Sequence, residues 1–221
     1  NGVHILNYDQ LNKKHQAKAD SYFSDIVFPV LTPLAFDPGH PFPHISNLSL
    51  NLAVLIEDKS EQQHFARIKV PSSLPRLYPI KRSSGSTKRD GTVPHHHYFV
   101  WIDQLIAKHL DQLFPGMAII EVHPFRVTRN EDVVIQELEA MDLLEAMEES
   151  VRNRRFGDVV RLSVNTDMPE YILNILIENL RVDPNDVYKL ETPLGLSNLF
   201  ELNNIDRFDL KFKPIVHNIP N

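Results

Sequence analysis

The sequence predicts an α+β fold: a single domain in which a mixed β-sheet carries interleaved helices. Residues 48–57 form an almost continuously apolar run, which is typical of a buried strand. Residues 64–70 alternate apolar and polar side chains, so the two runs are expected to pair as a hairpin. Helical patterns alternate with further strands, and no Ser- or Gly-rich linker is long enough to divide the 221 residues.

The first third of the chain is predicted to contain a short strand, a helix and a stiff connection. Residues 3–6 are apolar and compatible with a strand. Apolar residues at three- and four-residue spacing predict a helix from about Asp9 to Val27, capped by Asn7 or Asp9 and ended by Pro29. Five prolines between Pro29 and Pro43 exclude a helix or a central strand, so an extended segment should lead into the buried strand.

The middle of the chain is predicted to hold two strands and one helix after an irregular stretch. Residues 71–94 follow no regular pattern, and 81–91 have the composition of a flexible basic loop. A strand is expected at 98–101, followed by a helix at 102–114 that Pro115 and Gly116 stop. Residues 117–129 form a second long strand, in which Pro124 predicts an edge, a bulge or a bend.

The last third is predicted to begin with the longest helix. It runs from Val134 to about Arg155 and has one acidic face, which is most simply a solvated surface. The remaining elements are a strand at 159–164, a helix that opens at 168–170 and ends at 180, a strand at 187–190, a short helix at 195–202 and an extended tail at 208–220.

Composition narrows the functional classes. The chain has no cysteine, which excludes disulfides and thiol chemistry, and it has no apolar run long enough to cross a membrane. A net charge of −6 argues against a general nucleic-acid binder. The chain lacks an initiator Met and a signal peptide, so we expect a fragment or processed product, and the absence of cysteine fits a cytoplasmic origin.

The histidines are the first candidates for chemistry. His95 and His97 would share one face of a strand, which fits either a metal site or a polar strand entrance. His40 and His44 lie in the proline-rich segment, where they could meet a ligand or hydrogen-bond unpaired backbone groups. The sequence contains no standard nucleotide-binding motif.

Arg126 and Arg129, at the end of the second long strand, are the sharper candidates. A guanidinium group binds phosphate oxygens in a bidentate manner, so this pair would suit a phosphate chain. The competing interpretation is that each arginine pairs with a carboxylate of the following helix, such as Glu131 or Asp132.

Five stretches occur in the same order as in a known family. They are VLTPLAFDPGHPFPHISNLSLNLAV (30–54), HPFRVTRNED (123–132), RRFGDVVRL (154–162), YKLETPLGLSNLFEL (188–202) and FKPIVHNIP (212–220). Together they resemble bacterial polyphosphate kinases that work through a phosphohistidine. The resemblance covers nearly the whole chain and identifies residues 1–221 with the middle, or head, domain of that family.

The resemblance implies that the rest of the enzyme lies elsewhere. An N-terminal helical domain with an ATP-contacting asparagine would precede Asn1, and two phospholipase-D-like domains with the phosphohistidine and metal ligands would follow Asn221. No histidine of this chain is then the nucleophile. The parent enzyme would transfer the γ-phosphate of ATP reversibly to polyphosphate, using Mg²⁺, whereas this fragment would bind no cofactor and be inactive alone. Its role would be dimerisation and shaping the ATP/polyphosphate tunnel.

The resemblance thus implies an enzyme that is cytoplasmic or peripheral to a membrane. Its expected partners are the other domains, a second copy of the enzyme, ATP and polyphosphate, without nucleic acid and without a transmembrane segment. Arg126 and Arg129 are the expected polyphosphate contacts, and no catalytic or metal residue is assigned. One alternative is a stand-alone phosphate-ester or phosphohistidine hydrolase, which needs His95, His97 or His123 beside one of these arginines. Another is a pure interaction module, which predicts an exposed apolar patch and no convergent basic residues.

Overall fold

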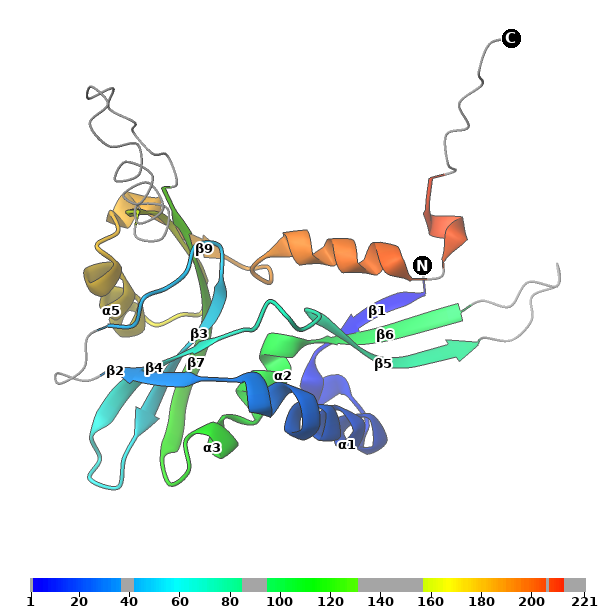
Figure 1. Ribbon diagram of the computed structural model, residues 1–221, viewed down its shortest axis with the longest axis horizontal. Helices are drawn as coiled ribbons and strands as arrows, with labels where there is room; N and C mark the ends of the chain where they lie inside the picture. Colours follow the sequence, from blue (N-terminus) through cyan, green and yellow to red (C-terminus); the bar gives the residue numbers. More distant parts are fainter. Residues whose placement is uncertain (1, 37–41, 85–94, 131–156, 206, 213–221) are drawn as a thin grey trace, which may run out of the picture.

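The computed structural model describes residues 2–36, 42–84, 95–130, 157–205 and 207–212. Within them, two β-sheets lie on either side of a group of short helices, and α5 covers the far side of the larger sheet (Figure 1). The smaller sheet has the strand order β1-β6-β5, and the larger has the order β2-β4-β3-β7-β8-β9. Two strand pairs are parallel and the others antiparallel, so the α+β class with mixed sheets is confirmed.

The strands are β1 (Val3–Leu6), β2 (Pro33–Phe36), β3 (Leu50–Glu57), β4 (Gln63–Lys69), β5 (Leu77–Ser84), β6 (His95–Trp101), β7 (Ala118–Arg129), β8 (Val159–Asn165) and β9 (Val187–Leu190). The α-helices are α1 (Lys13–Tyr22), α2 (Ile102–Lys108), α3 (Leu110–Leu113) and α5 (Glu170–Leu180). The tighter or wider helical turns are η1 (Tyr8–Gln10), η2 (Phe23–Val27), η3 (Phe28–Val30), η4 (Pro184–Asp186), η5 (Leu196–Asn204) and η6 (Phe208–Leu210).

The predicted hairpin forms the centre of the larger sheet. β3 pairs antiparallel with β4 on one side and with β7 on the other, and its residues from Asn51 to Ile56 are all buried. Successive side chains of a strand point to opposite faces, so β3 feeds two separate cores. Leu52 and Val54 belong to one core, whereas Ala53 and Leu55 belong to the other.

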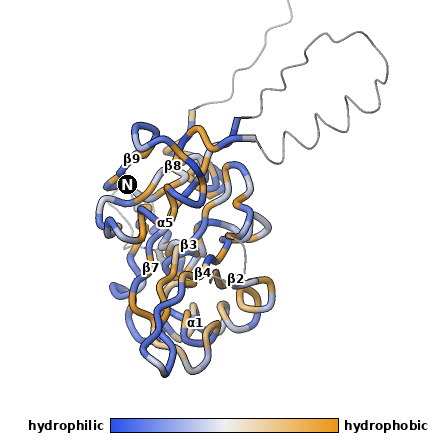
Figure 2. Tube along the Cα trace, turned by 90° about the vertical axis from the view of Figure 1, so that its left-hand side faces the viewer, coloured by the Kyte–Doolittle hydropathy of each residue, from blue (hydrophilic) through white to orange (hydrophobic). Residues whose placement is uncertain are grey.

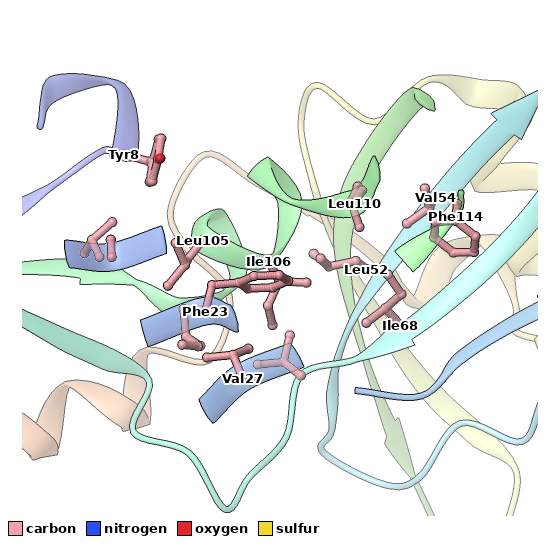
Figure 3. Packing of buried hydrophobic residues seen from close by; sticks show 14 of the residues in the cluster. Tyr8, Phe23, Val27, Leu52, Val54, Ile68, Leu105, Ile106, Leu110 and Phe114 are labelled. Atoms are coloured by element: carbon pink, nitrogen blue, oxygen red, sulfur yellow. The ribbon is translucent and has the colours of Figure 1, made fainter. Parts of the chain in front are cut away.

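The first core lies between the larger sheet and the helices that face the smaller sheet. In Figure 3, Phe23 and Val27 of η2 and Ile106 of α2 lie close to Leu52 and Ile68 of the hairpin. The second core lies under α5 and is built from the other side of the sheet together with the residues Ile172, Leu173, Leu176 and Leu180. These buried residues recur at three- and four-residue spacing, so they form one packing face of α5.

The proline-rich segment is more structured than expected. Phe28–Val30 form a 3₁₀ turn, and Pro33–Phe36 form β2, which pairs only with β4 at the sheet's edge. An edge strand tolerates proline because one side of it needs no ladder of N–H donors. Among the described residues, the prediction of a wholly extended segment is thus wrong in detail, while the exclusion of a central strand holds.

Three other predictions need correction. Residues 77–84 form β5, which the irregular pattern of 71–94 concealed; Pro79 and a register shift between Pro79 and Lys81 break its alternation. The helix expected at 9–27 begins at Lys13, where Asn12 caps it, and widens to a π-helix from Phe23. The helix expected at 102–114 breaks at His109, whose backbone leaves the helical region (φ −117°, ψ 26°).

Pro124 lies inside β7, a strand with neighbours on both sides. It stands opposite Leu52 of β3, and the pairing with β8 begins one residue later, at Phe125. The missing N–H of proline therefore falls where the second neighbour has not yet joined the ladder. The long acidic helix expected at 134–155 and most of the extended tail lie outside the described residues, while residues 208–210 of that tail form a 3₁₀ turn.

Hydrophobic and hydrophilic segments alternate along the chain trace (Figure 2). In the described part of the chain, no helix combines the length and apolar character that a membrane crossing requires.

Candidate anion-binding site

The two predicted arginines lie near the end of β7 and reach back to one earlier segment of the chain. The Arg126 Nε atom donates a hydrogen bond to the Leu48 carbonyl at 3.0 Å. The Arg129 Nε atom donates to the Ile45 carbonyl, and its Nη1 atom to the Gly157 carbonyl, both at 2.8 Å. Both arginines thus anchor residues 45–48 through backbone oxygens. The carboxylates weighed against a phosphate role, Glu131 and Asp132, lie outside the described residues.

Residues 45–49 form a tight connection into β3. The Leu48 N–H donates to the Val127 carbonyl at 3.0 Å, and the Asn47 side-chain oxygen accepts from the Arg129 N–H at 2.8 Å. Leu48 adopts a positive φ of 56°, a conformation that is uncommon for a branched side chain. The strain is maintained by these hydrogen bonds, so the segment is held in one position against the end of β7.

Two further cations, both on β4, contact this segment or the start of β3. Arg67 is 6% exposed, and its Nε atom donates to the Asn51 side-chain oxygen at 2.7 Å. Asn51 in turn donates to the Ser49 carbonyl oxygen at 3.0 Å. Lys69 donates to the Ser46 hydroxyl at 3.3 Å. We call Arg67, Lys69, Arg126 and Arg129 the cation cluster.

The cation cluster affects the pKa of His44. Partial burial, followed by the charges of Arg129, Arg67 and Lys69, lowers the pKa of its imidazole from the usual value. Three positive charges acting on one ring indicate that these side chains converge, although they come from two different strands. His44 is one of the two histidines that the sequence left without a role, and it has contacts of its own in the structure.

The described residues place little negative charge beside the cation cluster. Among the described residues, no carboxylate oxygen lies within 4.0 Å of any of its four side-chain nitrogen groups. Burial is the first cause that lowers the pKa of Arg126, and the nearby Arg161 is the second. Arg129 has Asp158 in range, which raises its pKa against the larger effect of burial. Concentrated positive charge in an acidic chain is what an anionic ligand would neutralise.

Two cavities adjoin the cluster. One has a volume of about 250 Å³ and is lined by Arg126, Lys69 and Arg76, among other residues. The second has a volume of about 300 Å³ and is lined by Arg67 and again by Lys69. The Arg129 side chain lies beside these cavities and hydrogen-bonds to the backbone oxygens of Ile45 and Gly157. Sequence reasoning missed Arg67 and Lys69, although their two-residue spacing in an alternating strand places both on one face.

The remaining histidines occupy other places. His95 and His97 lie on β6, where His97 stands opposite Arg82 of β5. The ring of the intervening His96 contacts His4, with 3.1 Å between their ring nitrogens. His123 lies on β7 between Glu121, at 2.6 Å, and Asp167, at 3.9 Å. Among the residues described, no group of three His, Cys, Asp or Glu side chains is arranged to hold a metal ion.

The chain is similar in sequence to one family over most of its length. The family described as "Polyphosphate kinase middle domain" matches residues 14–202. A polyphosphate kinase of Prosthecochloris aestuarii is 46% identical over 220 residues, which are 99% of this chain and 30% of that protein. Polyphosphate kinase 1 of Chlorobaculum tepidum is 44% identical over 216 residues, 97% of this chain and 30% of that protein. The chain thus spans about a third of the length of these relatives.

A solved structure shares the fold. The crystal structure of polyphosphate kinase from Porphyromonas gingivalis superposes with a TM-score of 0.70 at 20% sequence identity. The match covers 98% of this chain and 29% of that one.

Proposed function

The chain belongs to the polyphosphate kinase middle-domain family, and from this premise we propose that it is the non-catalytic head domain of such an enzyme. The complete enzyme would transfer the γ-phosphate of ATP reversibly to inorganic polyphosphate through a phosphohistidine. The head domain would support dimerisation and border the path of ATP and polyphosphate. The convergence of four cations on one segment carries the second part of this proposal, because the transferred chain is a polyanion.

In this proposal the two predicted arginines have different roles, one in binding and one in positioning. Arg126 lines a cavity beside Lys69 and contacts polyphosphate, whereas Arg129 holds residues 45–47 in place through the Ile45 carbonyl and the Asn47 side chain. ATP and Mg²⁺ are assigned to domains outside this chain, as the family resemblance implies. No step of the phosphoryl transfer is therefore assigned to the histidines described above.

Exposed apolar side chains support the dimerisation part. Leu196 and Phe200, both on η5, are 50% and 81% exposed. In Figure 1 this helix extends away from the larger sheet, beside β1 and β6. Such a surface suits another domain or a second copy of the enzyme. The cation cluster counts against a pure interaction module, which predicts no convergent basic residues.

The proposal predicts a specific pattern of activity. Residues 1–221 alone should show no ATP-dependent polyphosphate synthesis, whereas the complete enzyme should. In the complete enzyme, Arg126→Gln should raise the KM for polyphosphate by about tenfold and leave kcat nearly unchanged, since a removed charged contact is worth about 1.5–3 kcal/mol. Steady-state kinetics checks this, and Arg181→Gln, an exposed arginine at the end of α5, is the matched control. Synthesis by the isolated chain would refute the proposal, and an unchanged KM would refute the role of Arg126.

A further inference from the structure

The two cavities beside the cation cluster adjoin. Both are lined by Lys69, the last residue of β4, and by Pro71 and Ser72, which follow shortly after it. The cavity on one side continues to Arg126, and the cavity on the other side continues past Lys69 to Arg67. Because the two cavities share these residues, we treat them together as one bent groove, with Arg126 lining one part, Arg67 lining the other and Lys69 lining both.

The described residues compensate little of the positive charge of this groove. Among the described residues that line it, Glu201 is the one carboxylate, and its two oxygens accept hydrogen bonds from the backbone N–H groups of Arg76 and Leu77. Arg76 also lines the groove, but Asp103 balances its charge. Arg67, Lys69 and Arg126 remain as cations without a described carboxylate within 4.0 Å.

Arg67 is the residue that most requires a ligand. Its side chain is almost fully buried, yet its described partner is the neutral oxygen of Asn51. A buried charge without a counter-charge is costly, and an anion in the groove would reduce that cost. The hydrogen bonds from Ser49 through Asn51 fix the guanidinium group before any ligand arrives. This pre-organisation lowers the entropy lost on binding.

The lining also indicates which anion fits. Hydroxyl donors from Thr32, Ser72 and Ser73 accompany the cations, and no aromatic side chain is among the described residues that line either cavity. A nucleotide or a nucleic acid would find no ring on which to stack its bases. A polyphosphate chain carries no base, so it needs only cations and hydrogen-bond donors along its length.

We infer that the groove from Arg67 through Lys69 to Arg126 binds a condensed phosphate several phosphoryl units long. This inference rests on the proposed function and adds to it a site, two residues of β4 and a preference for chain length. A single orthophosphate would reach one end of the groove, whereas a longer chain would contact all three cations.

The test is calorimetric titration of residues 1–221 with medium-chain polyphosphate, orthophosphate and ATP in separate experiments. Polyphosphate should bind at least tenfold more tightly than the other two. Lys69→Gln should weaken polyphosphate binding about tenfold, as loss of one charged contact predicts, and should make it less sensitive to salt. Lys59→Gln, in the exposed turn of the same hairpin, removes the same charge and should change little.

Arg67→Gln should weaken polyphosphate binding by a similar factor, and circular dichroism checks that this variant is folded. If Arg67→Gln does not fold, the Lys69→Gln titration alone tests the inference. Equal losses in Lys59→Gln and Lys69→Gln would show nonspecific attraction and overturn the inference. Equal affinity for orthophosphate and polyphosphate would also overturn it. If polyphosphate does not bind while Arg126→Gln raises the KM of the complete enzyme, the groove fails and the proposed function stands. Synthesis by the isolated chain would refute the proposed function whatever the titrations show.

Discussion

Arg76 and Asp103 form the most deeply buried ion pair among the described residues. Their side chains are 5% and 13% exposed, and the Arg76 guanidinium also lies 5.1 Å from the centre of the Trp101 ring. Burial lowers the pKa of Arg76 and raises that of Asp103, while each charge opposes the shift of the other. The pair therefore depends on both partners, because either charge alone would remain in a poorly solvated place.

We expect Asp103→Ala to lower the free energy of unfolding by about 3–5 kcal/mol, since it leaves the Arg76 charge unpaired. Chemical denaturation of residues 1–221 measures this. The matched control is Asp9→Ala, which removes the partner of Lys108 from a pair whose side chains are 53% and 82% exposed. Its cost should be about 0–1 kcal/mol. Equal costs for the two variants would show that burial does not govern the Arg76–Asp103 pair.

The role of a single arginine was only half predictable from the sequence. Strand alternation and the end of a strand identified Arg126 as a candidate anion ligand. Its observed acceptor, the Leu48 carbonyl, comes from 78 residues earlier in the chain. Such a partner becomes visible only when the strand order is known. Arg67 was missed for a related reason, because nothing local distinguishes a buried arginine from an exposed one in an alternating strand.

At the scale of elements, the strands with a clear burial pattern were predicted and the irregular ones were not. β3 is buried on both faces, and β8 lies between two neighbouring strands. Their apolar residues therefore predict strands inside the sheet. β5 was overlooked because Pro79 and the basic residues after it break the period of two, and its pairing with β6 shifts register at that point. Tertiary pairing, which the sequence does not display, makes this segment a strand.

The position of η5 depends on one carboxylate. Glu201 accepts hydrogen bonds from the N–H groups of Arg76 at 2.9 Å and Leu77 at 3.1 Å, and so fastens η5 to the start of β5. Hydrogen bonds to a charged acceptor are worth about 1.5–3 kcal/mol each. Few other described contacts hold the outer face of this helix, since Phe200 is 81% exposed.

We therefore expect Glu201→Ala to accelerate amide hydrogen exchange in residues 196–204 and at the amides of Arg76 and Leu77 by about tenfold or more. Global stability should change less, because both cores stay intact. Glu191→Ala, an exposed carboxylate that precedes the same helix, is the control and should leave the exchange unchanged. Exchange of η5 that is unaffected by Glu201→Ala would show that other contacts hold the helix in place.

The whole molecule is organised around a sheet with a core on each face. The first core contains Phe23 and Ile106, and the second contains Phe125 and Leu176. β3 contributes alternate residues to both, so neither core can be lost without exposing the other side of the same strand. This sharing predicts a single cooperative unfolding transition in the described part of the chain.

The single tryptophan allows a direct test of this coupling. Trp101 lies at the end of β6, between Val100 and Ile102 of the first core, whereas Leu176 of α5 is fully buried in the second core. Leu176→Ala should cost about 2–5 kcal/mol, because it leaves a cavity among buried side chains. If the two cores unfold together, the Trp101 fluorescence transition and the far-ultraviolet dichroism transition should shift to the same lower denaturant concentration. Leu196→Ala, on the exposed face of η5, should shift neither. A dichroism transition that moves while the Trp101 transition stays would mean that the two faces of the sheet unfold independently.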